Sequence, residues 1–460
     1  AGAIWRRSMF ILFWRCVWQA AAILTDNEIL LVGPVQVGKA FLENLTGPDF
    51  IRTVLCSTGR IGMGFLAAFS CGLLFGALSY RYALLGEFFS PVIAVLKSIP
   101  VASFVVLLLI WFGSSGLSFY ISFLIVFPNV YVNTAAGLKS ADGELLEMAE
   151  VFGVGRWNRF CFLYRPALMP YLTSCLKVSL GMSWKSGVAA EVIGMPQNSL
   201  GERIYLSKIY LDTAGLFAWT LTVILLSFLF EKAVLHLLKR FEEWKPYPAL
   251  SPRPKERGAA LPEICIRNVS KAYGKHQVLS DYSLMLRPGG RYCLMAPSGE
   301  GKTTLLHLLN GMSLPDMGTI EGVPQRVGMV FQEDRLCGDY DVAANVLLTL
   351  HCTAGCGRRA KEKAVEKIRS EAVEILPTEC LTSPVKELSG GMKRRCAVLR
   401  AMLSGAEFVV MDEPFTGLDE ENRRKTAAFI LERQEGRTLL VTTHREEDAK
   451  LLSGELIALK

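Results

Sequence analysis

Charged residues are scarce in this chain of 460 residues, since Asp, Glu, Lys and Arg make up 20% of it and hydrophobic residues 51%. So little charge predicts a membrane-embedded portion, and the length predicts two or three domains. The net charge of +7 is modest for this size, and the basic residues are not gathered into a stripe. We therefore expect no nucleic-acid partner. The twelve cysteines lack the spacing of a disulfide framework, a pattern typical of a reducing compartment.

One stretch predicts a phosphate-binding loop. Residues 296–304 read Ala-Pro-Ser-Gly-Glu-Gly-Lys-Thr-Thr, after a short apolar run at 292–295 and before a run with helical spacing at 305–310. Strand, glycine loop and helix follow one another in the order that such a loop requires. Gly299 and Gly301 allow backbone N–H groups to close around phosphate oxygens, and the helix N-terminus adds partial positive charge.

The side chains of this loop fit the same interpretation. Lys302 can reach the β- and γ-phosphates, and the Thr303 hydroxyl can ligate Mg²⁺. Ala296 stands where the pattern G-x-x-x-x-G-K-[ST] has its first glycine, and alanine is small enough if its φ is negative. The predicted nucleotide-binding residues here are Ala296, Ser298, Gly299, Gly301, Lys302, Thr303 and Thr304.

A second G-x-x-x-x-G-K pattern occurs at residues 33–40. It has Ala40 where Mg²⁺ needs a hydroxyl, and no partner motifs follow it. We expect it to bind no nucleotide.

Partner motifs do follow the first loop. The apolar run 408–411 predicts a buried strand that ends in Asp412 and Glu413, where one carboxylate can hold Mg²⁺ through water and the next can orient the attacking water. Tyr273, upstream, can stack on an adenine ring. The remaining motifs are Phe331-Gln332-Glu333, Leu388-Ser389-Gly390-Gly391-Met392, Thr416-Gly417-Leu418-Asp419 and Thr442-Thr443-His444.

In this order, the motifs closely resemble the nucleotide-binding domain of ABC transporters, over residues 261–460. The resemblance implies ATP and Mg²⁺ as cofactors, Gln332 as a Mg²⁺ and communication residue, and Ser389-Gly390-Gly391 as the signature that contacts ATP. It also implies Glu413 as the catalytic carboxylate and His444 as the switch histidine. Met392 stands where the family usually has glutamine, and the Ser-Gly-Gly before it matches the family pattern.

The N-terminal half contains apolar segments long enough to cross a bilayer. Residues 8–24 could belong to a signal peptide, but no small-x-small cleavage site follows, so we interpret them as a first span with a cytoplasmic N-terminus. Six spans place both ends on the cytosolic side, and Lys and Arg are more frequent on the predicted inner segments. Lys97-Ser98-Ile99-Pro100 interrupts the third span, and Gly72-x-x-x-Gly76 in the second could permit close packing. The predicted spans are 8–24, 61–80, 88–112, 117–138, 167–193 and 216–238.

The inner loop between spans four and five, residues 142–166, predicts a short helix at 144–152 that stops at Gly153. It resembles the E-A-A-x-x-x-G loop of ABC importer permeases, with Met148 and Arg165 as departures. The resemblance implies that this helix docks into a groove of the ATPase near Gln332. The implied coupling residues are Glu147, Ala149 and Gly153.

Residues 33–244 as a whole look like permeases of the nitrate/sulfonate/taurine group. The likeness is carried by Leu96-Lys97-Ser98-Ile99-Pro100, Trp111-Phe112-Gly113, Glu147 to Gly153 and Ala190-Glu191-Val192-Ile193-Gly194. We therefore expect a multi-domain chain: an all-α polytopic membrane domain of about six transmembrane helices, similar to type I importer permeases, followed by an α/β P-loop ABC ATPase domain. The expected boundaries are 1–241 for the membrane domain, 242–262 for a semi-extended linker with five prolines, and 263–460 for the ATPase.

These resemblances imply a half-transporter, because each ATP in the family lies between the phosphate loop of one ATPase and the Ser-Gly-Gly of another. We expect a homodimer in the cytoplasmic membrane of a prokaryote, in contact with lipid, and an extracytoplasmic solute-binding protein as a separate partner. Lys177, Lys185 and Glu191 lie inside a span and either face the translocation path or pair and snorkel. A small anion such as a sulfonate, taurine or nitrate is favoured as substrate. The alternatives are a vitamin or thiamine-precursor-like pyrimidine, an exporter half-transporter and a regulatory ATPase that does not transport.

Overall fold

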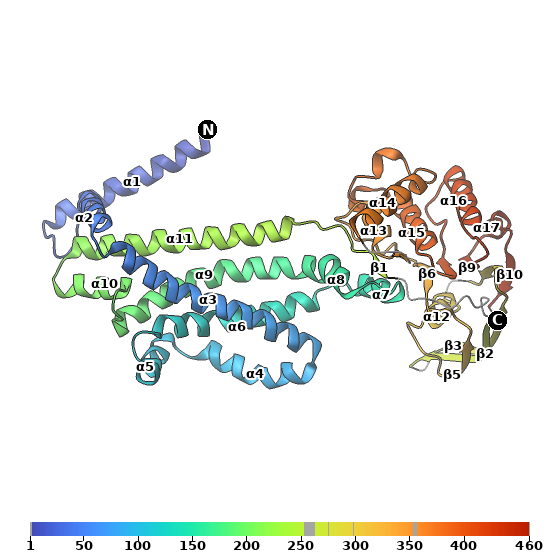
Figure 1. Cartoon of the computed structure of the whole chain (residues 1–460), viewed down its shortest axis with the longest axis horizontal. Helices are drawn as coiled ribbons and strands as arrows, with labels where there is room; N and C mark the ends of the chain where they lie inside the picture. Colours follow the sequence, from blue (N-terminus) through green and yellow to red (C-terminus); the bar gives the residue numbers. More distant parts are fainter. Residues whose placement is uncertain (1, 253–262, 275, 298, 353–356, 460) are drawn as a thin grey trace. The chain divides into compact units, whose positions relative to one another are not determined.

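The computed structural model describes residues 2–252, 263–274, 276–297, 299–352 and 357–459, which form two compact units (Figure 1). The membrane unit comprises Ala1–Ser140 and Pro166–Trp244, and the ATP-binding unit comprises Ala141–Arg165 and Lys245–Lys460. The inner loop between the fourth and fifth expected spans thus packs with the ATP-binding unit. The expected domain boundaries stay a prediction, because residues 253–262 of the linker lie outside the described residues.

The described part of the membrane unit is all helical. Its helices are α1 (Gly2–Thr25), α2 (Pro34–Thr46), α3 (Phe50–Arg81), α4 (Ala83–Ser98), α5 (Val101–Phe112), α6 (Leu117–Lys139), α9 (Arg165–Gly194), α10 (Leu200–Ile209) and α11 (Thr213–Glu243). Residues 33–40, the second glycine-lysine pattern of the sequence, cap and begin α2, with Pro34 in its first turn, and so form no phosphate loop.

Length and hydropathy qualify α3, α6 and α11 as membrane spans within the described residues, and α4 with α5 as a fourth that is bent by 105°. The bend falls at Ile99-Pro100, as the sequence predicts, because proline lacks an N–H and forces the residue before it into extended backbone. Helices α1 and α9 are not among these spans, and α9 carries Lys177, Lys185 and Glu191 in its interior. That α1 and α9 cross the membrane stays a prediction.

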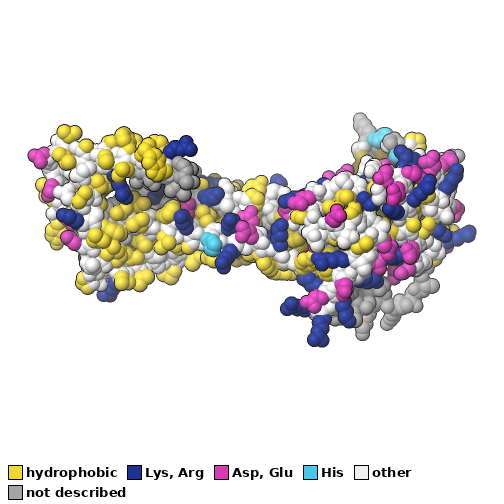
Figure 2. All heavy atoms as spheres, turned by 90° about the horizontal axis from the view of Figure 1, so that it is seen from above, with side chains coloured by type: hydrophobic (Ala, Val, Ile, Leu, Met, Phe, Trp, Pro, Cys, Tyr) yellow, Lys and Arg dark blue, Asp and Glu magenta, His cyan; other side chains and the backbone are white. Residues whose placement is uncertain are grey.

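Glycines on α3 allow close contact with α6. A Cβ at Gly64 would collide with the backbone carbonyl of Phe119, and a Cβ at Gly76 would lie 2.8 Å from the carbonyl oxygen of Tyr131. Gly72 faces Val130 in the same way. Small residues replace hydrophobic attraction as the means of packing helices in lipid. The face of the membrane unit that Figure 2 shows is largely hydrophobic, as its yellow side chains indicate.

We expect Gly64→Ala to lower the stability of the membrane unit by about 1–3 kcal/mol, because the added methyl group meets backbone that cannot move aside. The matched control is Gly59→Ala on the same helix, where a Cβ would meet nothing within 4 Å. The midpoint of thermal unfolding of the solubilised chain measures the difference. Equal midpoints for the two variants would show that α3 and α6 are not in close contact.

The ATP-binding unit is built on mixed α/β structure. Its helices are α7 (Gly143–Val151), α8 (Arg156–Arg159), the π-helix Phe160–Tyr164, α12 (Lys302–Leu309), α13 (Val342–Leu347), α14 (Arg358–Ala372), the 3₁₀-helices Thr378–Cys380 and Val385–Glu387, α15 (Gly390–Leu403), α16 (Glu420–Glu432) and α17 (Glu446–Leu451). Its strands are β1 (Ser251–Pro252), β2 (Ile264–Tyr273), β3 (His276–Leu286), β4 (Arg291–Met295), β5 (Met317–Glu321), β6 (Val327–Val330), β7 (His351–Cys352), β8 (Phe408–Asp412), β9 (Thr438–Thr443) and β10 (Glu455–Ala458).

The described strands form a five-stranded parallel sheet in the order β10-β4-β9-β8-β6, a three-stranded antiparallel sheet in the order β3-β2-β5, and the short pair β1-β7. Strands β8 and β9 are buried along their whole length, which explains the apolar runs 408–411 and 439–441 within them. In such sheets, ligands bind beyond the carboxyl ends of the strands.

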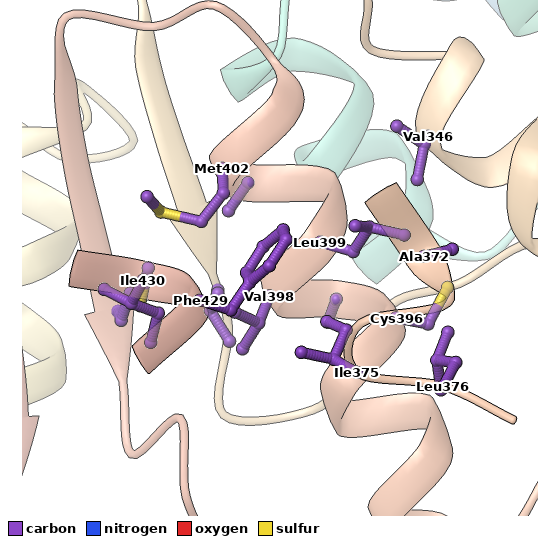
Figure 3. Packing of buried hydrophobic residues seen from close by; sticks show 14 of the residues in the cluster. Val346, Ala372, Ile375, Leu376, Cys396, Val398, Leu399, Met402, Phe429 and Ile430 are labelled. Carbon is purple, nitrogen blue, oxygen red and sulfur yellow. The ribbon is translucent and has the colours of Figure 1, made fainter. Parts of the chain in front are cut away.

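A hydrophobic cluster around α15 fixes the position of that helix. Val398, Leu399 and Met402 of α15 pack with Phe429 and Ile430 of α16 (Figure 3). Residues of α13, α14 and the segment after α14 complete the cluster in the same view: Val346, Ala372, Ile375 and Leu376. Because α15 begins at the Ser-Gly-Gly motif, this core holds the motif in a fixed place.

Candidate functional site

The loop between β4 and α12 has the geometry of a phosphate cradle. Gly299 and Gly301 have φ angles of +89° and +94°, a region that side chains other than glycine rarely adopt. A Cβ at Gly301 would also lie 2.7 Å from Cγ1 of Val278. The backbone of Ala296 is not left-handed, so alanine is tolerated there, as expected. Ser298 lies outside the described residues.

Lys302 is buried, and its ammonium points back into the loop. Its Nζ donates hydrogen bonds to the carbonyls of Ala296 and of Pro297, the latter at 3.1 Å, and lies 3.4 Å from Nδ1 of His444. Thr304 is half-buried in the first turn of α12. The Lys302 ammonium is therefore positioned close to a phosphate bound by the N–H groups of the loop.

Thr303 and Asp412 are brought together by adjacent elements. The Thr303 hydroxyl donates to Oδ2 of Asp412 at 3.2 Å, and the Asp412 side chain is almost fully buried. Carboxylate and hydroxyl oxygens are ligands that suit Mg²⁺, so these two residues could hold it. Gln332, the third predicted ligand, follows β6 with an exposed side chain, and its carbonyl accepts a hydrogen bond from Arg394.

Glu413 is held at the mouth of the same site. Its φ of +49° is unusual for a residue with a side chain, and strained backbone of this kind clusters at functional positions. Oε1 of Glu413 lies 2.5 Å from Nε2 of His444, and Oε2 accepts a hydrogen bond from the Thr416 hydroxyl at 3.2 Å. The carboxylate is therefore oriented from two sides, as a residue that positions water requires.

Thr442 belongs to the motif at residues 442–444, but the sequence analysis gave it no role of its own. Its hydroxyl donates to Oδ1 of Asp412 at 2.6 Å and accepts the backbone N–H of Glu413 at 3.1 Å. The parallel register of β8 and β9 places Thr442 opposite Asp412. The signal was its place directly after the apolar run 439–441, which becomes informative only when β8 and β9 are known to be neighbours.

Two predicted nucleotide-binding elements are exposed. Ser389 caps α15 by accepting the N–H of Met392 at 3.4 Å, and Ser389 and Gly390 face outward. Tyr273 is 51% exposed at the end of β2, with the ammonium of Lys271 5.7 Å from its ring centroid. Their contacts with a nucleotide stay a prediction.

The loop that resembles the importer motif forms the short helix α7. Asp142 caps it by accepting the N–H of Glu144 at 2.9 Å, and Gly153 follows it with a φ of +62°. The helix and its end fall where the sequence predicts them, to within one residue at each end.

Helix α7 and the residue after it are packed into the ATP-binding unit. Met148 and Ala149 are fully buried, and the ring of Phe152 has the guanidinium of Arg400 5.2 Å from its centroid. Glu147 pairs with Arg335 at 2.8 Å. Since Arg335 lies three residues after Gln332, the helix occupies a groove beside the predicted communication residue.

Arg400 fixes the floor of this groove. It is fully buried and donates to the carbonyl of Arg335 at 2.5 Å and to that of Asp334 at 3.1 Å. Burial lowers the pKa of Arg400 to about 10, so the side chain is still charged at neutral pH. Replacing it by an apolar residue would leave these carbonyls without their donor.

Residues 245–252, which we name the strap, are folded against the ATP-binding unit, although the sequence predicts a semi-extended tether over 242–262. Asn158 of the inner loop donates to the carbonyl of Ala249 at 2.7 Å, and its Oδ1 accepts the N–H of Ala249 at 3.0 Å. The Tyr247 hydroxyl donates to Asp341, and β1 pairs with β7. Burial, with a smaller contribution from Asp341, raises the pKa of Tyr247 to about 12.

The three ionisable residues predicted for the translocation path differ in position. Lys177 and Lys185 are exposed on α9. Glu191 is fully buried, and its carboxylate accepts hydrogen bonds from Ser57 at 2.7 Å and Ser118 at 3.2 Å. Glu191 therefore joins α3, α6 and α9 within one chain, and a role in the translocation path stays a prediction for all three residues.

Three features together define a nucleotide-driven membrane transporter. They are the parallel sheet with its phosphate loop, the acidic residue Glu413 with its left-handed backbone at the edge of that sheet, and α7, which lies in sequence between two membrane-unit helices and is buried in the ATP-binding unit. A family model described as "ABC transporter" matches residues 279–416, and one described as "binding-protein-dependent transport system inner membrane component" matches residues 64–243. The chain belongs to the ABC transporters, a class of ATP hydrolases coupled to transport, and joins an importer-type permease to its ATPase.

Curated relatives match the ATPase half. The chain is 35% identical over 207 residues to the Nod factor export ATP-binding protein I of Cupriavidus metallidurans, covering 42% of this chain and 66% of that protein. It is 34% identical over 228 residues to the protein of the same name from Rhizobium etli, covering 46% of this chain and 70% of that protein. It is 35% identical over 211 residues to the spermidine/putrescine import ATP-binding protein PotA of Methylococcus capsulatus, covering 42% of this chain and 52% of that protein. The chain thus spans about two thirds of the export relatives and about half of the import relative.

Among solved structures, the dimeric structure of a bacterial ABC transporter cassette is similar over 43% of this chain and 94% of that chain, with 25% identity and a TM-score of 0.39.

Proposed function

We propose that the chain is one half of an ATP-driven importer in the cytoplasmic membrane of a prokaryote, with its ATPase in the cytosol. The observation that carries the proposal is α7, which lies inside the region matched by the binding-protein-dependent permease family and is buried in the ATPase beside Gln332. A buried helix contributed by the permease sequence gives the ATPase a contact through which to move the membrane helices. Exporters carry longer cytoplasmic helix extensions in place of such a loop, which makes the exporter alternative weaker.

The substrate we favour is a small organic or inorganic anion such as a sulfonate, taurine or nitrate. A vitamin or a thiamine-precursor-like pyrimidine is the alternative. The curated relatives do not decide the question, because their names cover both an export and an import ATPase at about 35% identity. An extracytoplasmic solute-binding protein would deliver the substrate.

At the ATP site, the N–H groups around Gly299 and Gly301 receive the phosphates, and Lys302 turns from the loop carbonyls to the β- and γ-phosphates. Thr303, Asp412 and Gln332 would hold Mg²⁺, which neutralises charge on the phosphates. Glu413 accepts a proton from the attacking water as its oxygen bonds to the γ-phosphorus and the bond to the leaving ADP oxygen breaks. His444 keeps the carboxylate of Glu413 in position.

Two copies of the chain complete two equivalent ATP sites, each with the phosphate loop of one copy and Ser389-Gly390-Gly391 of the other. Closure of the sites moves α7, because α7 is buried in the ATPase. To shift the population almost completely from the open form to the closed form, ATP must bind the closed form more tightly than the open form by about 5.5 kcal/mol.

A complementation experiment tests this dimer. Lys302→Ala removes the phosphate contact in one copy, and Ser389→Arg blocks the signature of the other. Neither variant alone should hydrolyse ATP, since every site in either homodimer is damaged. When the two are co-expressed, each mixed dimer has one intact site, so we expect recovery of about a quarter of the wild-type rate.

Phosphate release from the purified full chains in nanodiscs measures the rate, and identical yields and melting curves control for folding. Full activity of Lys302→Ala alone, or no recovery in the mixture, would show that sites are not shared between copies.

A further inference from the structure

A cavity of about 150 Å³ lies in the membrane unit at the break between α4 and α5. The two halves of the bent pair form one side of it, and α6 and α9 close it. Its lining residues are Leu96, Lys97, Ile99, Val101, Phe104, Ile121, Leu124, Ile125, Pro128, Asn129 and Met182. The neighbouring glycine contacts of α3 with α6 keep this part of the bundle tightly packed, so the cavity is a feature of the break itself.

The cavity has apolar walls with one positive charge. Lys97 and Asn129 are its charged and amide side chains, and none of the described residues that line it is a carboxylate. Within the described residues, Lys97 has no carboxylate within 4.0 Å. Glu191, the buried carboxylate of this unit, is already engaged by Ser57 and Ser118. Lys97 is exposed in the last turn of α4, beside the break, and an ionisable residue in a membrane segment is by default a candidate functional residue.

Backbone groups at the cavity add polar contacts. Pro128 has no N–H, so the carbonyl of Leu124, one turn earlier in α6, lacks its helical donor. Pro100 precedes α5 without a side-chain cap, and Val101, the first residue of that helix, lines the cavity. The first-turn N–H groups of α5 are therefore left as donors at a cavity that Lys97 also lines.

We propose that this cavity is a substrate subsite that takes the anionic head of a short organic anion, with Lys97 and Asn129 as its polar contacts. This inference rests on the proposed function and names a site that the path residues Lys177, Lys185 and Glu191 do not include. The ammonium pairs with the negative group, and Nδ2 of Asn129, which donates one hydrogen bond to the carbonyl of Ile125 at 3.4 Å, has a second N–H to donate to it. Leu96, Phe104 and Ile121 pack against a short alkyl part, which a bare inorganic ion does not have.

The subsite is tested by protection of Lys97 from an amine reagent. The full chain in nanodiscs is treated with trinitrobenzenesulfonate, and labelling of each lysine is followed by peptide mass spectrometry. Ethanesulfonate is the probe, and ethyl methyl sulfone is the neutral control of similar shape. We expect ethanesulfonate, but not the sulfone, to slow labelling of Lys97. Lys239 on α11 is the internal control, since it pairs with Glu243 at 3.4 Å and should be unaffected.

Asn129→Leu keeps the size of the side chain and removes its donor, so we expect about a tenfold higher ethanesulfonate concentration for half protection. Unchanged protection in this variant, or equal protection by nitrate and ethanesulfonate, would overturn the assignment of the subsite. Equal protection of Lys97 and Lys239 would do the same.

ATP hydrolysis measured in the same nanodiscs separates this result from the proposed function. If Lys302→Ala and Ser389→Arg complement each other and ethanesulfonate still leaves Lys97 unprotected, the proposed dimer is supported and the proposed subsite is contradicted. If complementation fails, the proposed function falls, whatever the labelling shows.

Discussion

Glu413→Gln should slow ATP hydrolysis by about 100- to 10,000-fold while the chain still binds ATP. Glutamine keeps the size of the side chain and can still meet His444, but it cannot accept a proton from water. The closed, ATP-loaded dimer should therefore accumulate. Phosphate release under saturating ATP, together with ATP retained after rapid gel filtration, measures both effects.

Glu435→Gln is the matched control for this variant. Glu435 is an exposed glutamate of the same unit that also has a left-handed backbone, with a φ of +48° compared with +49° for Glu413. It has no place at the nucleotide site, so its amide should leave the rate unchanged. If both variants hydrolyse ATP at the rate of the unaltered chain, Glu413 is not the base.

Phe152→Ala should release α7 from the ATP-binding unit. Phe152 is 5% exposed, and its ring covers the guanidinium of Arg400. Truncating a buried phenylalanine costs about 3–5 kcal/mol, a loss that falls on the docking of α7. Amide hydrogen exchange of residues 143–151 should become about 100-fold faster, which hydrogen-exchange mass spectrometry of the full chain measures.

Trp157→Ala supplies the comparison, because Trp157 is an aromatic residue of the same inner loop that is 61% exposed. Its removal should leave the exchange of α7 as it was. A second pair of variants tests the ion pair: Glu147→Arg should speed exchange, and adding Arg335→Glu should restore it. Slow exchange in Phe152→Ala would mean that the ring does not hold the helix.

The sequence was most informative where function depends on a short run of residues. The phosphate loop, the pair Asp412-Glu413 and the helix that ends at Gly153 each have a local geometry that neighbouring residues impose, and the structure places them accordingly. The break at Pro100 was predictable for the same reason, because proline acts on its own backbone.

Contacts between distant parts of the chain could not be predicted in this way. Arg335 follows Glu147 by 188 residues, and Asn158 precedes Ala249 by 91. Nothing in either local sequence names its partner, since the pairing depends on how helices and sheets pack. The cavity at Lys97 was hidden for a related reason: the sequence shows a charge inside a span, but only the packed helices show that, among the described residues, the cavity is lined by no carboxylate.

The reciprocal hydrogen bonds between Asn158 and Ala249 have a consequence for how the transporter is assembled. They join the segment that leaves the last membrane helix to the loop that the ATPase grips, all within one polypeptide. Tethered groups meet at an effective concentration in the millimolar range, so dilution does not separate the permease half from the ATPase half. The permease and ATPase halves are therefore made in equal numbers, and in the proposed homodimer the encounter of two whole chains is the concentration-dependent step of assembly.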